Sequence, residues 1–244
     1  MLPQKTFLTM DCALYSSDFD VTSDISIRRL MEITQGAATT HADRLGIGWD
    51  RMDENGLFWV LSKVKIVFHK PITRKESGFK LYTWPVAANR LYLERRFEGE
   101  DGQGELLFSS STLWMIVERD SRKIASRETV AQYYNFDFDT AECGCDNNFD
   151  RVRKDESYSL SYERQIRRTD LDLNKHVNNT NYVNYALDVL SQTERIAEAE
   201  IVYHKELKCG DVVKIYSKRE NNAVYVVGER DGETSFTVKF TLAN

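Results

Sequence analysis

Residues 170–182 read Asp-Leu-Asp-Leu-Asn-Lys-His-Val-Asn-Asn-Thr-Asn-Tyr. The first ten of them hold two carboxylates, three amides and one imidazole. Asp172, Asn174 and His176 stand two residues apart, so an extended backbone would present all three on one face. A single Asp or Asn before a helix is usually a turn former or a cap. A run this rich in polar groups, placed directly before a helical pattern, instead indicates a functional site.

The residues after this motif predict an amphipathic helix that runs to about Glu194. Tyr182, Tyr185, Ala186 and Val189 recur at helical spacing and would form one apolar stripe. Asn179 reads as the N-cap, because its amide oxygen can accept the free N–H groups of the first turn. The motif therefore predicts polar side chains at the positive end of a buried helix, where a carbonyl can be polarised and an oxyanion stabilised.

Two segments of the chain occur twice in the same order. Residues 18–26 align with 170–178, and residues 66–72 align with 201–207. This indicates a duplicated domain. Three aligned positions differ in chemistry: the second copy has Asn174, His176 and Glu206, where the first has Thr22, Asp24 and Pro71. An active site kept in one half only would leave this pattern, so Glu206 becomes a candidate partner of Asn174 and His176.

The coarse pattern of elements is that of an α+β protein made of two similar halves. Each half has a strand, a polar segment, a helix and an antiparallel meander. We expect an N-terminal half at 1–128, a connector at 129–148 and a C-terminal half at 149–244. The predicted helices cover about 25–45 and 179–194. Strands are expected near 8–19, 57–69, 78–87, 91–98, 105–117, 157–168, 199–207, 211–219, 222–229 and 234–242.

Bulk properties limit the classes of function. The chain has 244 residues, 41% of them hydrophobic, and a net charge of −5, which argues against a general nucleic-acid binder. No apolar run is long enough for a transmembrane span or a secretory signal, so we expect a cytoplasmic protein without stable membrane anchoring. Cys143 and Cys145 lack a second Cys/His pair at ligand spacing, and we expect neither a metal nor a cofactor.

A basic cluster precedes the polar motif and contains Arg151, Arg153, Lys154, Arg164, Arg167 and Arg168. Such residues are typical of a solvated strand edge. They would also suit a docking patch for an acidic partner or for a phosphate-bearing substrate. We take Arg164, Arg167 and Arg168 as the docking candidates and leave both interpretations open.

These motifs resemble the acyl-acyl-carrier-protein thioesterases, a family with a double hotdog fold. The family pattern Asp-x-Asp-x-Asn-x-His-Val-Asn-Asn-x-x-Tyr is satisfied from Asp170 to Tyr182. The resemblance extends over most of the chain and includes 59–62, 83–84, 96–97, 111–114 and 203–206. It implies a tandem hotdog in which each half wraps a helix in an antiparallel sheet. By position it implies the catalytic residues Asp172, Asn174, His176 and Glu206.

The resemblance also implies a substrate and a division of labour. The expected reaction is hydrolysis of long- or medium-chain acyl thioesters of acyl carrier protein, whose acyl-phosphopantetheine arm makes the carrier the partner. The N-terminal half would shelter the acyl chain. An acyl-CoA thioesterase is the alternative substrate class, and a non-catalytic acyl-thioester sensor is a less favoured reading. Chain length stays open, as does the choice between monomer and homodimer.

The expected mechanism uses water as the nucleophile. Plant members of the family carry a cysteine directly after the glutamate, where this chain has Leu207, while Cys209 lies two residues further on. In a strand through residue 207, Cys209 would face away from Glu206. Glu206 would therefore act as general base on a water. Backbone N–H groups near Asn178 and Asn179 would hold the oxyanion.

Overall fold

The computed structural model describes residues 7–86, 92–135, 138 and 141–243. The N-terminal half contains β1 (Leu8–Ala13), η1 (Ser16–Asp18), α1 (Ile27–Arg44), α2 (Trp49–Glu54), β2 (Leu57–Phe68), β3 (Gly78–Pro85), β4 (Leu93–Glu100), β5 (Leu106–Glu118) and α3 (Arg127–Tyr133). The C-terminal half contains β6 (Ser159–Gln165), η2 (Arg168–Asp170), α4 (Asn179–Leu187), β7 (Ile196–Tyr203), β8 (Val212–Glu220), β9 (Ala223–Arg230) and β10 (Glu233–Leu242). The predicted connector at 129–148 thus begins inside α3.

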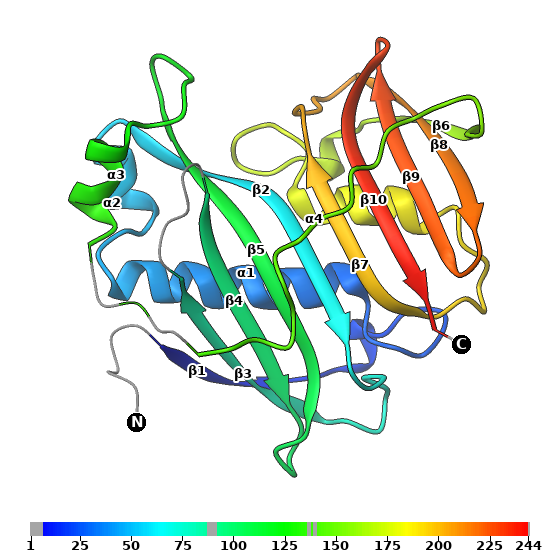
Figure 1. Ribbon diagram of the computed structural model, residues 1–244, viewed down its shortest axis with the longest axis horizontal. Helices are drawn as coiled ribbons and strands as arrows, with labels where there is room; N and C mark the ends of the chain where they lie inside the picture. The colour runs from blue at the N-terminus through cyan, green and yellow to red at the C-terminus, as the bar shows by residue number, and fades with distance from the viewer. Residues whose placement is uncertain (1–6, 87–91, 136–137, 139–140, 244) are drawn as a thin grey trace.

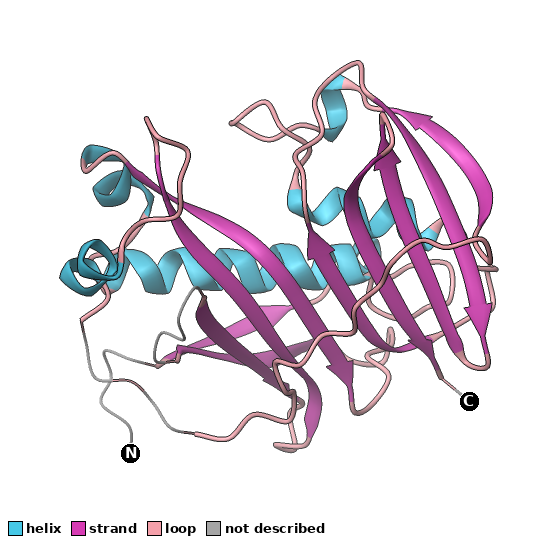
Figure 2. Ribbon diagram, turned by 45° about the horizontal axis from the view of Figure 1, so that its top comes forward, coloured by secondary structure: helices cyan, strands magenta, loops and turns pink. Residues whose placement is uncertain are grey.

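One antiparallel sheet of ten strands joins the two halves. Its order is β1-β3-β4-β5-β2-β7-β10-β9-β8-β6, so each half repeats the same order from its edge to the centre. The halves meet where β2 pairs with β7, from Lys63 opposite Val202 to Val67 opposite Glu198. Helices α1 and α4 lie on one face of this sheet (Figures 1 and 2). This arrangement confirms the α+β double hotdog fold.

The helices and the sheet share one hydrophobic core. Leu30 of α1, Tyr185 of α4, and Ile66 and Ile201 of the two central strands all belong to the same buried cluster. Apolar residues at helical spacing supply the helix faces, and alternation along β2 and β7 supplies the sheet face. Because the core crosses the boundary between the halves, each half depends on the other for burial.

A pair of glycines shows the duplication inside the sheet. Gly99 on β4 lies against the ring of Phe108 on β5, and Gly228 on β9 lies against the ring of Phe236 on β10. A Cβ at either glycine would overlap the ring of its partner. β4 and β5 occupy the same places in the first half as β9 and β10 in the second. The close packing of a ring on a strand backbone therefore occurs once in each half.

Helix α4 is shorter than predicted, because it ends at Leu187 instead of near Glu194. Arg219 on β8 donates to the carbonyl of Val189, an acceptor that a continued helix would use. Glu194 forms an ion pair with the same arginine and accepts from the N–H of Ser191. These contacts hold residues 188–195 as a turn that returns the chain to β7.

The segment after α3 crosses the face of the sheet opposite the helices (Figure 1). There Lys65 Nζ lies 3.1 Å from Asp146 Oδ1 and 3.4 Å from Glu200 Oε1. Asp150 donates its N–H to Glu200 at 2.7 Å. Lys65 is buried from the N-terminal half and Glu200 from the C-terminal half, so this segment covers charged groups from both. Cys143 and Cys145 are free thiols within it, and burial raises the pKa of each.

Candidate active site

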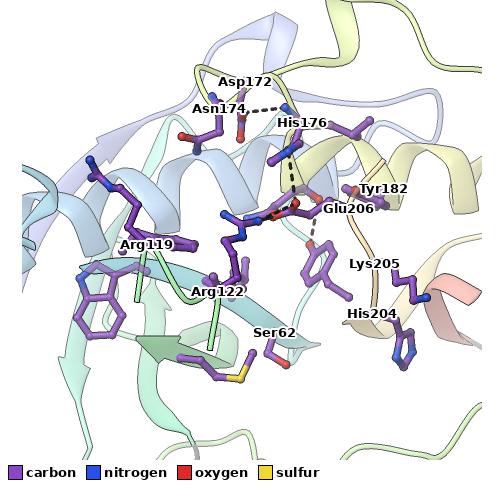
Figure 3. Close-up of a pocket in the computed structure, with 18 of the residues that line it drawn as sticks. Ser62, Arg119, Arg122, Asp172, Asn174, His176, Tyr182, His204, Lys205 and Glu206 are labelled. Atoms are coloured by element: carbon purple, nitrogen blue, oxygen red, sulfur yellow. Dashed lines mark hydrogen bonds and ion pairs between the residues drawn. The ribbon is translucent and has the colours of Figure 1, made fainter. Parts of the chain in front are cut away.

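A cavity of about 430 Å³ opens where the two halves meet, and both contribute to its walls. The four residues predicted as catalytic, Asp172, Asn174, His176 and Glu206, all line it. Figure 3 shows them around one space, with Arg119, Arg122 and Ser62 of the N-terminal half facing them. The structure therefore brings together side chains that are far apart in the sequence.

The polar motif forms a tight turn, so the prediction of an extended backbone is wrong. The N–H of Asp172 donates to the carbonyl of His176 at 2.8 Å, and Lys175 lies at φ 63°. Asp172 Oδ1 accepts the N–H of Asn174 at 2.8 Å and that of His176 at 3.4 Å. Asn174 and His176 reach the cavity because this carboxylate folds the backbone between them, as Asp side chains do in turns.

The first half contains the same turn without the same side chains. Asp20 donates its N–H to the carbonyl of Asp24, accepts the N–H of Thr22 at 2.8 Å, and precedes Ser23 at φ 67°. Each of these features matches one in the second turn. Asp24, at the position of His176, forms an ion pair with Arg195. The duplicated turn is thus present twice, and in the first half an ion pair occupies the place of the imidazole.

The N-cap of helix α4 is Asn178, one residue earlier than the predicted N-cap Asn179. Asn178 Oδ1 accepts the N–H of Thr180 at 2.9 Å and its hydroxyl at 2.8 Å. The N–H of Asn178 itself donates to Asp170 O at 2.9 Å and is not available to a ligand. Among the described residues the N–H of Asn179 has no acceptor, and Asn179 lines the cavity. Only Asn179 therefore fits the expected oxyanion donor.

Glu206 lies in a loop, because β7 ends at Tyr203 and not at residue 207. The N–H of Val177 donates to Leu207 O at 2.9 Å, which fixes this loop beside the motif. The N–H of buried Leu207 donates to the Tyr182 hydroxyl at 3.1 Å. As a result His176 Nε2 lies 3.3 Å from Glu206 Oε2. Backbone pairing, and not strand alternation, places the carboxylate next to the imidazole.

Cys209 is exposed and does not line the cavity. Strand β7 ends at Tyr203, so alternation along a strand does not place Cys209 relative to Glu206. The separation itself agrees with the structure, since Glu206 borders the cavity and Cys209 does not.

Arg119 and Arg122 line the cavity and were not found from the sequence. Arg122 Nη2 lies 3.2 Å from Glu206 Oε2, and Arg119 forms an ion pair with Asp53. Arg122 precedes Glu206 by 84 residues, so no local spacing connects them. The predicted docking residues lie elsewhere: Arg164 pairs with Asp170 at 3.0 Å, and Arg164, Arg167 and Arg168 are absent from the cavity wall.

A second cavity of about 210 Å³ adjoins the first inside the N-terminal half. Its walls include Ala38, Ala42, Ile47, Trp59, Leu93 and Trp114. Asn174 and Asn179 border both cavities. The buried Arg95 also borders it and donates to His41 Nδ1 at 3.0 Å and to Thr83 Oγ1 at 3.2 Å. Burial lowers the pKa of Arg95 to about 10, so the guanidinium stays charged at neutral pH.

No group of three or more His, Cys, Asp or Glu side chains in the described ranges is arranged to hold a metal ion. No helix within residues 7–86, 92–135 and 141–243 is long and apolar enough to cross a membrane.

The fold and the cavity define a double-hotdog protein with an Asn–His–Glu site at the junction of its halves. The chain belongs to the acyl-ACP thioesterase family. Residues 5–133 match the model of the acyl-ACP thioesterase N-terminal domain, and residues 153–243 match that of the C-terminal domain.

Known proteins share this architecture at low sequence identity. An acyl-ACP thioesterase structure from Bacteroides thetaiotaomicron is 22% identical, with a TM-score of 0.85 over 97% of this chain and 98% of that one. The 12:0-ACP thioesterase from Umbellularia californica is 19% identical, with a TM-score of 0.82 over 100% of this chain and 99% of that one.

Curated relatives come from plants. A chloroplastic acyl-[acyl-carrier-protein] hydrolase of Cuphea viscosissima is 24% identical over 76% of this chain and 48% of its own length. A chloroplastic oleoyl-acyl carrier protein thioesterase of Arabidopsis thaliana is 22% identical over 90% of this chain and 65% of its own length. The chain spans about half the length of the first of these relatives.

Proposed function

We propose that the protein hydrolyses acyl thioesters of acyl carrier protein and releases free fatty acids. Asn174, His176 and Glu206 line one cavity, and an apolar cavity adjoins it; this arrangement is the main support for the proposal. A thioester carbonyl is electrophilic enough for attack by an activated water. Membership in the acyl-ACP thioesterase family supports the choice of substrate.

In the proposed mechanism Glu206 removes a proton from a water whose oxygen attacks the thioester carbon. His176, 3.3 Å from the carboxylate, and Asn174 orient the water and the carbonyl. The N–H of Asn179 donates to the carbonyl oxygen as it becomes an oxyanion. The C–S bond then breaks, and the proton held by Glu206 returns to the leaving thiolate. Asp172 takes part by holding the turn.

The acyl chain occupies the second cavity in this proposal. Trp59 and Trp114 lie on its wall with their rings 6.4 Å apart. The N-terminal half would thus bind the chain and the C-terminal half would carry the Asn–His–Glu site, with the division near residues 129–148.

The partner would be the acidic carrier protein, and exposed Arg167 and Arg168 remain candidates for docking it. Arg164 is less suited, because it is engaged with Asp170. A cytoplasmic location and a monomeric or homodimeric state remain predictions. The plant relatives are named as chloroplastic.

Steady-state hydrolysis of acyl-carrier-protein thioesters from eight to eighteen carbons tests the function, with Glu206→Ala and Cys209→Ala as the variants. We expect turnover in the wild type and in Cys209→Ala, and loss of about 10² or more in Glu206→Ala. Loss in folded Cys209→Ala would contradict the water mechanism. Equal turnover of acyl-CoA would favour the acyl-CoA thioesterase, and tight binding without wild-type turnover would favour the sensor.

A further inference from the structure

One cation of the N-terminal half, Arg122, contacts the proposed general base Glu206. Arg122 Nη2 lies 3.2 Å from Oε2 and 3.4 Å from Oε1 of Glu206. Figure 3 shows both Arg122 and His176 in contact with the carboxylate of Glu206. The carboxylate therefore has one partner from its own half and one from the other.

The loop after β5 gives Arg122 a defined direction. Its N–H donates to Glu118 O at 3.0 Å, and the N–H of Glu118 donates to Lys123 O at 2.9 Å. Arg122 itself lies at φ 56°, a conformation that non-glycine residues rarely adopt. Its guanidinium also stacks on the Phe58 ring at 5.1 Å. A tight turn and an aromatic ring thus hold the cation over the cavity.

Glu206 needs such support because it stands on a loop and is half-exposed. Without Arg122, the one ion-pair partner left to Glu206 among the described residues is His176, whose 3.3 Å contact holds a single oxygen. A carboxylate held by one contact can rotate away from the water that it must activate. A guanidinium close to both oxygens restricts that rotation.

We propose that Arg122 is a positioning residue for thioester hydrolysis, holding the Glu206 carboxylate toward the thioester from the opposite half of the molecule. This inference rests on the proposed role of Glu206 as general base. It gives the N-terminal half a part in the chemistry in addition to binding the acyl chain. Without the loop after β5, which carries Arg122, the turn at residues 172–176 would hold Glu206 through His176 alone among these contacts.

The Arg122–Glu206 pair is exposed enough that its effect on stability is small. Exposed pairs of this kind contribute little to folding stability, because water and salt screen them. A loss of activity in a variant that keeps its melting temperature therefore reports on positioning. Lys214 and Glu163 form an ion pair of similar exposure on the β8–β6 edge and provide a matched control.

The test compares Arg122→Ala, Arg122→Lys and Lys214→Ala in steady-state hydrolysis of an acyl-carrier-protein thioester. We expect Arg122→Ala to lower kcat about ten-fold or more with KM within two-fold, as for a group that acts through the base. Arg122→Lys should recover much of kcat, and Lys214→Ala should match the wild type. An unchanged kcat in Arg122→Ala, or a loss confined to KM, would overturn the inference.

A double-mutant cycle separates this inference from the proposed function. In a Glu206→Gln background, Arg122→Ala should change the residual kcat by less than about two-fold, because residues acting as a unit are not additive. Equal losses in both backgrounds would mean that Arg122 acts on the substrate directly, which overturns positioning. If Glu206→Gln is inactive and Arg122→Ala is fully active, the proposed function stands and the positioning role of Arg122 is rejected. If Glu206→Gln is active, the role of Glu206 as general base and the role of Arg122 are both rejected.

Discussion

At the residue scale, the site depends on a backbone conformation that its sequence does not favour. Lys175 in the second turn and Ser23 in the first both have φ above +60°, in the left-handed region. Both side chains are exposed, so their conformational cost is not repaid by packing. The hydrogen bonds of Asp172 and Asp20 impose this conformation on the two turns.

Replacing these two residues tests how far the turn controls the chemistry. A β-branched residue is strained in the left-handed region, so Lys175→Val and Ser23→Val should each lower the free energy of unfolding by about 1–2 kcal/mol. Only Lys175→Val should also lower kcat, because Asn174 and His176 flank it. Denaturant melts and steady-state rates measure the two effects, and Lys175→Gly should restore both. Equal kcat losses in the two valine variants would contradict this account.

At the element scale, the early end of α4 depends on an ion pair with β8. The hydrogen bond from Arg219, the largest cause, lowers the pKa of Glu194 to about 2 from an ordinary value of 4.5. A depressed pKa means that the folded protein holds the charged form more tightly than the unfolded chain does. The stabilisation is therefore complete above pH 4.5 and is lost as the pH falls toward 2.

The pH dependence of a single variant checks this link. Glu194→Gln should have a lower free energy of unfolding than the wild type at pH 7, and the difference should shrink as the pH falls below 4.5. Urea melts of both proteins between pH 7 and pH 3 give the comparison. A difference that stays constant over this range would show that the carboxylate charge is not what holds residues 188–195.

The bounds of some helices and strands could be predicted from the sequence, and those of others could not. Helix α1 and most strands were predicted close to their observed bounds, because each buries one face and its apolar residues are spaced accordingly. The strand expected at 8–19 ends at Ala13, and the strand expected at 199–207 ends at Tyr203. The end of α4 and the loop position of Glu206 were missed, since Arg219 and the Tyr182 hydroxyl act on them from distant elements. Arg122 was missed for the same reason. The motif predicted which side chains share the cavity, whereas its two-residue spacing did not reveal the turn that the local hydrogen bonds of Asp172 form.

At the scale of the whole molecule, buried charges tie the halves together on the outer face of the sheet. Lys65 is 7% exposed and Glu200 is 4% exposed, and they belong to opposite halves. The segment that carries Asp146 and Asp150 closes over them. This contact and the β2–β7 pairing favour one cooperative unfolding transition for the chain.

Removing the buried cation should therefore cost far more than removing an exposed one. Lys65→Met leaves Glu200 with the N–H of Asp150 and, as its nearest remaining cation among the described residues, Lys239 at 3.9 Å, and should destabilise the protein by roughly 3 kcal/mol. Lys214→Met, which breaks an exposed pair, should cost less than about 1 kcal/mol. Guanidinium melts followed by fluorescence and by circular dichroism measure both. Similar costs for the two variants, or separate transitions for the two probes, would contradict this picture.

The turn at residues 20–24 of the first half lacks the Asn and His side chains of its counterpart and contains an ion pair between Asp24 and Arg195. In the first half, two opposite charges neutralise each other and join the halves. In the second half, the side chains of His176 and Glu206 are 22% and 45% exposed beside an open cavity, where a substrate could reach them. The duplication therefore provides an internal comparison of one loop in two settings: one copy joins the halves through an ion pair, and the other carries side chains of the proposed active site.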